Sequence, residues 1–408
     1  MGRHFTALGG SVAKRVVNGD APDTSLAVVL YLAALSALGE FATTSYLPAI
    51  SSIASGLGVH VTVVQATVTL GLVVSAASGL LVGAFVDALP RKSVLLVGLA
   101  SYTIGSLLAA VAPGYMLLFA GRALQASGSC VGLMIGRAIA RDLSKGAELT
   151  KLLAGVNLIY LLAPAVAPII GGFLDEWLGW RAIFGFAALY GATVFVGAFA
   201  LRESRRPIDT GAQPEAMLRR YVEILGSPRF LLSSFQSAAL LGALFAFVVN
   251  AAPMFVSELG FRPAVVGFFP GITVAGVVLG SYLAGQLATT WRPETLVGVG
   301  AAIAFAAAIA MTASPVAAPS LLSILIVFNI GLGIVMPAST AIALSGFAHC
   351  AGAASALVGF VQVSGGAVGS ILVSVIDLPP HTAMPVAMLV LSGASLTSTL
   401  LLRLFPAH

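Results

Sequence analysis

Long apolar stretches recur along the whole chain and constrain its fold more than any other feature. A helix needs about 20 apolar residues to cross the hydrocarbon core of a bilayer. About twelve stretches of that length occur, near 26–50, 62–86, 93–111, 115–139, 150–172, 181–201, 230–256, 264–288, 295–313, 319–345, 351–376 and 382–404. They are too long and too continuous for the alternating segments of a membrane β-barrel. The sequence therefore predicts an all-α polytopic membrane protein with twelve transmembrane helices.

The composition agrees with this class, because 59% of the residues are hydrophobic and 9% are charged. Soluble domains carry roughly 25% charged residues. The first stretch is too long for the core of a signal peptide, so we expect it to be retained. Residues 1–25 are then a cytoplasmic tail. Cys130 and Cys350 are expected to be thiols, with no disulfide and no metal.

Basic residues indicate the orientation, since they accumulate in cytoplasmic loops. With the N-terminus in the cytoplasm, only Arg181 and Arg262 of the 20 Lys and Arg residues fall outside, and Arg122 falls within the membrane. We therefore expect both termini in the cytoplasm. The net charge of +5 is a topology signal rather than a nucleic-acid-binding surface.

The longest polar stretch, about 202–228, separates two six-helix halves, 26–201 and 229–408. A shift of 202 positions places Gly83 on Gly285 and Gly98 on Gly300, while Asp87 falls on Thr289. Parallel repeats of six helices occur in transporters, with the substrate site between the halves. We expect two related bundles joined by a cytoplasmic linker.

Glu40 is the single charged residue in the first apolar stretch. A charge at the bilayer centre costs roughly 2.5–3.5 kcal/mol on insertion scales, so such residues are usually functional. Helical spacing places Ser36, Thr43, Thr44 and Leu47 on the same face. This face should point into the bundle.

Arg122, Gln125 and Ser129 form a second polar stripe, in the stretch 115–139. At about 1.5 Å per residue, Glu40 lies roughly 15 Å and Arg122 roughly 10 Å below the outer membrane surface. The two could therefore pair. Burial raises and a nearby arginine lowers the pKa of a carboxyl group, and a balance of the two suits proton binding and release. A static ion pair that only fixes helix packing is the alternative.

Three strings occur in order along the first half: GLLVGAFVDALPRK at Gly79–Lys92, GRALQASG at Gly121–Gly128, and APAVAPIIGG at Ala163–Gly172. Together they resemble the signature motifs of the major facilitator superfamily. With TSYLPAI at 44–50, they are most similar to the bicyclomycin/chloramphenicol-resistance (Bcr/CflA) type of drug:proton antiporter. The resemblance is strong over about 40–190 and thinner beyond.

Two positions depart from the family pattern. Ala88 and Pro90 replace a basic residue and a glycine in the loop motif. Related exporters also carry an acid just before the YLP string, where Thr44 and Ser45 stand here, so Glu40 is the natural substitute.

The resemblance implies a role for several groups of residues. Proton coupling would involve Glu40 and Arg122. A conformational switch would use Gly83, Asp87, Arg91 and Lys92 in the loop, and Pro164, Pro168, Gly171 and Gly172 further on. Loop charges can hold one state closed, whereas proline and glycine allow bending and close helix packing.

Polar and aromatic side chains in both halves are candidates for substrate contact, since ligand cavities combine apolar walls with few polar anchors. The candidates are Tyr31, Glu40, Thr43, Thr44, Tyr46, Gln125, Asn157, Tyr160, Gln236, Asn250, Asn329 and Gln362. Hydrogen bonding between helices is the alternative role for each.

An enzyme is not expected. The chain has no phosphate loop with a lysine, and its five histidines are scattered without metal-ligand spacing. We expect no cofactor and no metal. The partners would be a small molecule, protons and lipid, without nucleic acid, and the protein would be a monomer in a bacterial inner membrane.

The resulting hypothesis is export of small lipophilic compounds, such as phenicol antibiotics, in exchange for protons. Three alternatives stay open. These are export of an endogenous metabolite or siderophore, proton-coupled nutrient import, and a receptor that no longer transports.

Overall fold

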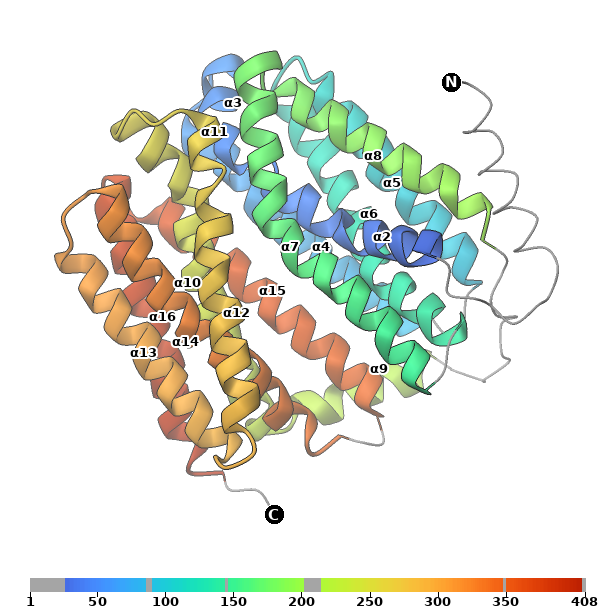
Figure 1. Ribbon diagram of the computed structural model, residues 1–408, viewed down its shortest axis with the longest axis vertical. Helices are drawn as coiled ribbons and strands as arrows, with labels where there is room; N and C mark the ends of the chain where they lie inside the picture. The colour runs from blue at the N-terminus through green and yellow to red at the C-terminus, as the bar shows by residue number, and fades with distance from the viewer. Residues whose placement is uncertain (1–25, 86–89, 144–145, 202–213, 348–349, 406–408) are drawn as a thin grey trace.

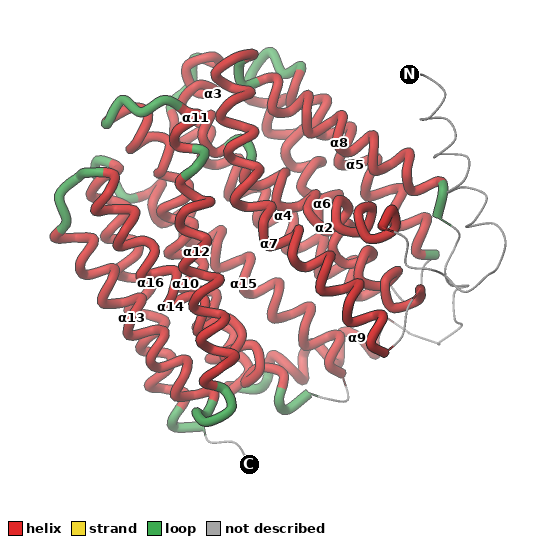
Figure 2. Tube along the Cα trace, in the orientation of Figure 1, coloured by secondary structure: helices red, strands yellow, loops and turns green. Residues whose placement is uncertain are grey.

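The computed structural model describes residues 26–85, 90–143, 146–201, 214–347 and 350–405, and these residues are almost entirely helical (Figures 1 and 2). The first half contains α2 (Leu26–Thr44), η1 (Leu47–Ala49), α3 (Ile50–Leu57), α4 (Val61–Phe85), α5 (Arg91–Ala110), α6 (Tyr115–Leu143), α7 (Gly146–Leu178) and α8 (Arg181–Phe199). The rest contains α9 (Pro214–Leu225), α10 (Pro228–Ala252), η2 (Pro253–Glu258), α11 (Pro263–Val266), α12 (Phe269–Leu287), α13 (Pro293–Ala313), α14 (Ala318–Leu344), α15 (Ala351–Val375) and α16 (Pro380–Leu402).

Eleven helices among the described residues are long and apolar enough to span a membrane. α7, with 33 residues, corresponds to the remaining expected stretch and is not among the eleven; part of it has no described side chains. Helices suit this environment because lipid offers no partners for backbone N–H and C=O groups. The predicted fold class is confirmed.

Proline and glycine explain several helix ends. Pro228 begins α10, where the Ser227 hydroxyl accepts a hydrogen bond from the Phe230 N–H at 3.3 Å. Proline is well suited to a first turn because the N–H that it lacks would be unpaired there. Gly58 ends α3 with a φ of +65° and Gly179 follows α7 with +79°, values that glycine adopts without strain.

Two expected helices are interrupted, and one helix lies where a linker was expected. The stretch 26–50 forms α2 only to Thr44, before η1 and α3. The stretch 264–288 is divided into α11 and α12 around Gly267. The expected linker contains α9, whose Ile224 is buried.

The two halves repeat one pattern of neighbours. In the first, α6 contacts α2, α4 and α5, and α5 contacts α8; in the second, α14 contacts α10, α12 and α13, and α13 contacts α16. One apolar core lies within residues 32–198 and another within 240–402. A third core joins the halves and includes Tyr46, Ile53, Val249 and Ala387.

The halves meet along α4 and α15, and through α7 with α11 and α12. At the end that holds α3 and α11, η1 also contacts α10, and α3 contacts η2. We call this the α3 end and the opposite one the α9 end. Figure 1 shows α7 and α12 side by side near the α3 end and separating below it.

Candidate functional site

Arg122 is the most buried charged side chain among the described residues, with 2% of its surface exposed. Its Nη1 donates to the carbonyl oxygen of Ala42 at 2.7 Å and to Oε1 of Gln125. The guanidinium carbon lies 4.2 Å from the centre of the Tyr46 ring. A cation can be stabilised this way by about 2 kcal/mol or more when desolvated. Arg122 therefore links α6 to the end of α2.

Hydrogen bonds extend this cluster to α4 and α5. The Tyr46 hydroxyl lies 3.2 Å from Oγ1 of Thr67. Gln125 Nε2 donates to Oγ of Ser106 at 2.8 Å. Four helices thus hold one buried cation in place.

Glu40 lies on α2, two residues before the carbonyl that Arg122 contacts, and its side chain is half-buried. Three neighbouring hydroxyls donate to carbonyl oxygens of their own helix one turn earlier: Ser36 to Leu32, Thr43 to Gly39, and Thr44 to Glu40 at 2.7 Å. Their backbone bonds satisfy the hydroxyl protons and leave oxygen lone pairs available. The Glu40–Arg122 ion pair stays a prediction.

The two glycines of GRALQASG explain how Arg122 is positioned. A Cβ at Gly121 would lie 2.8 Å from the Ala109 nitrogen, and one at Gly128 would lie 2.6 Å from the Tyr102 nitrogen. Both glycines therefore let α6 pack closely on the α5 backbone, as small residues do in membranes. Arg122, one residue after Gly121, contacts α2 through the Ala42 carbonyl oxygen.

The APAVAPIIGG residues lie where the halves meet. Gly171 packs against the Ser45 carbonyl oxygen at the end of α2. A Cβ at Gly172 would lie 2.7 Å from the Pro263 carbonyl oxygen. Pro168 is buried, and its carbonyl oxygen faces Gly267. Pro164 is half-buried one turn earlier. This string therefore lines the closest approach of α7 to α11.

The loop motif is only partly described. Asp87 lies outside the described residues, and Gly83 lies in the last turns of α4. Arg91 is buried, with 6% of its surface exposed. Lys92 Nζ donates to the carbonyl oxygens of Phe199 at 3.1 Å and Leu201 at 2.7 Å. Lys92 thus neutralises the end of α8, where a cation is favourable.

The second-half candidates lie on different helices and have different partners. Asn250 Oδ1 accepts from Nε2 of Gln65 at 2.9 Å, which is a contact between the halves. Gln362 Nε2 donates to Ser237 Oγ at 3.1 Å. Asn329 Nδ2 donates to the Thr273 carbonyl oxygen at 2.9 Å, inside the second half. Gln236 is fully buried, and its amide atoms have no hydrogen-bond partner among the described residues.

Tyr31, Asn157 and Tyr160 also have no described contact with the Arg122 cluster. The Tyr31 hydroxyl donates to the Val194 carbonyl oxygen at 3.0 Å, and its ring faces Gly197, so it joins α2 to α8. Asn157 and Tyr160 lie on α7, but their side chains are outside the described set.

Polar contacts between the halves were not predicted from the sequence. Gln65 and Thr69, one turn apart on α4, contact Asn250 and Ser370; Oγ1 of Thr69 lies 2.7 Å from Oγ of Ser370. Their spacing on an apolar helix was the available signal, since polar groups in a membrane helix usually face a partner.

Contacts at the α3 end were also missed. Glu176 on α7 forms an ion pair with Arg262, the residue before α11. Oγ of Ser51 lies 3.0 Å from Oγ of Ser257. Both contacts join the halves across their closed end.

Asp175 is the neighbouring acid at this end and lies beyond the expected membrane stretch. Its Oδ2 accepts a hydrogen bond from Ser52 Oγ at 2.7 Å, and its side chain is buried. Burial raises the pKa of Asp175, and the hydrogen bond from Ser52 lowers it in part.

Comparison with known proteins places the chain in a family. The family model described as Major Facilitator Superfamily matches residues 30–370. The chain belongs to the major facilitator superfamily. This membership makes it a transporter of the superfamily and not an enzyme.

Several relatives of this superfamily transporter have names that refer to antibiotic or multidrug resistance. It is 31% identical over 382 residues to "Chloramphenicol resistance protein" of Pseudomonas aeruginosa, covering 90% of this chain and 88% of the relative. It is 28% identical over 359 residues to "Multidrug resistance protein D" of Escherichia coli (strain K12), covering 87% and 89%. The resemblance inferred from the motifs is confirmed.

A solved structure supports the same fold. The structure titled "Crystal structure of D-xylose-proton symporter" matches with a TM-score of 0.73 at 14% identity, covering 93% of this chain and 97% of that one. With its eleven candidate spans and bacterial relatives, the superfamily transporter is a multi-pass protein of the bacterial inner membrane.

Proposed function

We propose that this transporter exports small lipophilic compounds in exchange for protons. The observation that carries the proposal is the buried Arg122 guanidinium, bonded to α2 two residues from the half-buried Glu40. An acid beside a fixed cation can exchange a proton for a substrate when its surroundings change. The resistance names of the relatives support export of antibiotics such as phenicols.

In this mechanism Glu40 holds the proton or meets the substrate, and Arg122 sets which of the two is favoured. Residues 26–201 and 229–408 act as the two domains, with 202–228 as the linker. The α3 end faces outward, and both termini lie in the cytoplasm. The site between the domains is then open to one side of the membrane at a time, which is alternating access.

The switch residues belong to the same proposal. Gly171 and Gly172 keep α7 close to its neighbours at the α3 end, and this contact must separate when the outer side opens. Lys92 ties α5 to the end of α8 and keeps the first domain rigid. Asn250 and Gln362, with their partners on other helices, are the second-half residues that we assign to substrate contact.

Ligand-induced proton release from purified protein in detergent tests the proposal. Neutral and cationic antibiotics are added to wild type, to Glu40→Gln and to Glu223→Gln, which changes an exposed acid on α9. We expect release from wild type and Glu223→Gln but none from Glu40→Gln. Equal release from Glu40→Gln would remove Glu40 from the mechanism.

Vesicles then test the coupling directly. An imposed pH gradient should drive uptake of the same compound by inverted vesicles with wild type. Uptake should fail with Glu40→Gln, although that variant still folds. Equal uptake by wild type with and without the pH gradient would exclude proton exchange.

A further inference from the structure

A groove lies between α13 and α16, on the part of the second half that is farthest from the first. Its apolar length is lined by Gly298 and Ala302 on α13 and by Leu396 and Leu400 on α16. Leu400 is 55% exposed. Figure 1 shows α13 at the outer edge of the bundle, beside α14 and α16. In a membrane-spanning helix pair, such an exposed apolar groove faces lipid.

Small side chains create the groove. An ideal Cβ at Gly298 would have Cγ2 of Thr399, at 3.7 Å, as its nearest heavy atom. Described protein atoms therefore leave space beside Gly298 that a larger side chain would occupy.

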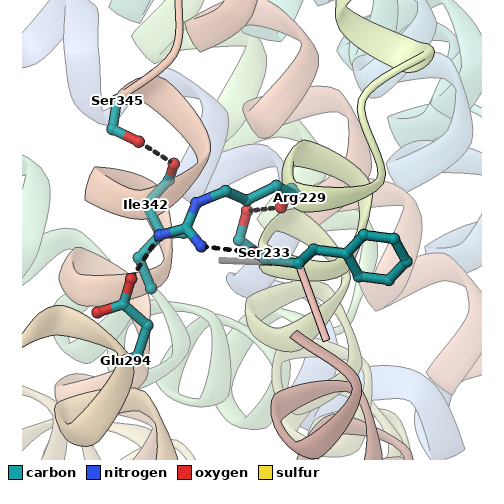
Figure 3. A network of polar contacts seen from close by, with 6 residues as sticks. Arg229, Ser233, Glu294, Ile342 and Ser345 are labelled. Carbon is teal, nitrogen blue, oxygen red and sulfur yellow. Dashed lines mark hydrogen bonds and ion pairs between the residues drawn. The ribbon is translucent and has the colours of Figure 1, made fainter. Parts of the chain in front are cut away.

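One end of the groove carries charge. Glu294 and Arg403 line it. Glu294 is held in an ion pair by Arg229, as Figure 3 shows. Arg229 Nη1 also donates to the Phe405 carbonyl oxygen at 2.9 Å. The acid at this end is thus already neutralised from inside the protein.

Two exposed arginines also lie at this end of the part of the chain that the structure describes. Arg403 follows α16 and Arg292 precedes α13, and both are exposed. The partial positive charge at the N-terminus of α13 and the partial negative charge at the C-terminus of α16 lie at the same end and offset each other, so the two arginines set the sign. An anionic group is therefore favoured here, at the level where helices of a membrane protein leave the hydrocarbon.

We propose that this groove binds an anionic phospholipid, with an acyl chain along Gly298 and Ala302 and the phosphate at Arg403. The combination of an apolar length and a cationic end matches an amphiphile of that charge. A zwitterionic lipid would fill the same space but would gain less from Arg292 and Arg403.

The test is a titration of phosphatidylglycerol into delipidated protein, followed by native mass spectrometry. Gly298→Leu should abolish binding of the first lipid, because the new side chain fills the groove. Arg403→Gln should weaken it about fivefold, the effect of one basic residue near an anionic lipid.

Matched substitutions elsewhere serve as controls. Gly285→Leu places the same side chain at an exposed position on α12 with nothing within 4 Å. Arg220→Gln removes an exposed arginine from α9. Both should bind lipid as wild type does. If Gly298→Leu cannot be obtained folded, the surface variant Arg403→Gln decides the question.

Three outcomes would overturn the proposal. One is unchanged lipid binding by both Gly298→Leu and Arg403→Gln. Another is equal binding of phosphatidylethanolamine by wild type, which would remove the anionic selectivity. A third is displacement of the lipid by glycerol 1-phosphate, which would indicate a site for a free phosphate group.

Discussion

Arg122 and Tyr46 form a buried cation–π pair, with the guanidinium carbon 4.2 Å from the ring centre. Arg181 and Trp180 form a second pair with the same distance, 4.2 Å, at the α3 end. Each arginine also donates to a carbonyl oxygen, Arg122 to Ala42 and Arg181 to Ala112. The decisive difference is burial, because Arg122 is enclosed by four helices while Arg181 is exposed.

Because the two cation–π pairs differ in burial, we expect an arginine-to-lysine substitution to have a larger effect at Arg122 than at Arg181. Arg122→Lys keeps the charge but loses the planar fork and most of the ring contact. We expect a loss of about 2 kcal/mol in stability and of pH-driven transport. Arg181→Lys should change stability by less than about 1 kcal/mol and leave transport intact. Thermal unfolding and vesicle uptake measure both; transport lost equally in the two variants would contradict a special role for Arg122.

The close packing at Gly128 leads us to expect that a larger side chain there disturbs packing and leaves the charged groups unchanged. In Gly128→Ala the new Cβ would press on the α5 backbone near the Tyr102 nitrogen, at 2.6 Å without relaxation. Overpacking of this kind costs about 1–3 kcal/mol. Gly285→Ala, at a position with nothing within 4 Å, should not lower the unfolding temperature. Equal unfolding temperatures for the two variants would show that α5 and α6 can separate freely.

The contact between Ser51 and Ser257 leads us to expect that a disulfide at these positions stops transport. Their Oγ atoms lie 3.0 Å apart across the closed α3 end. In a chain with Cys130→Ala and Cys350→Ala, the pair Ser51→Cys and Ser257→Cys should form a disulfide under oxidation. Transport should stop and return on reduction, because the halves can no longer separate there.

The control for this cross-link is Ser52→Cys with Ser257→Cys. Ser52 donates to Asp175 on α7, so we expect this pair to cross-link poorly and to transport in both conditions. Full transport by the oxidised Ser51–Ser257 pair would show that the α3 end does not open.

The burial of Asp175 leads us to expect that its protonation makes the stability of the protein depend on pH. Because burial raises the pKa of Asp175 in the folded state, the folded protein binds this proton more tightly than the unfolded chain does. The stabilisation is therefore complete below the ordinary aspartate value, about 3.9, and is lost as the pH rises through the raised pKa. Asp175→Asn should remove this slope from unfolding temperatures measured between pH 4 and 7.

An exposed acid provides the reference for that measurement. Asp377→Asn, just beyond α15, should keep the wild-type slope. If Asp175→Asn also kept it, other groups would account for the pH dependence.

The two halves differ in charge at equivalent places. Lys92 and Glu294, 202 positions apart, lie in the first turns of α5 and α13. Lys92 binds the end of α8 directly, whereas Glu294 binds Arg229, which in turn binds Phe405 beyond α16. The alignment by 202 positions indicated the equivalence, but only the structure shows that two different charges stabilise matching helix ends.

Helix positions were predictable because lipid imposes both length and composition on each span. The stretch 295–313 was expected, and α13 runs Pro293–Ala313. The interruption at Gly267 was not expected, because hydropathy does not register a tight packing contact. Gly267 faces the Pro168 carbonyl oxygen of the other half, about a hundred residues away in the chain.

The sequence by itself determined the class of fold, the family resemblance, and Glu40 and Arg122 as its unusual charges. These follow from local properties, namely apolar length, charge cost in lipid and short motifs. Only the tertiary structure decided which groups meet: Arg122 with Ala42 and Tyr46, Gln65 with Asn250, and Glu176 with Arg262. The physical reason is that apolar periodicity specifies where a helix runs, whereas its neighbours depend on close packing at glycines and on polar partners far away in the chain.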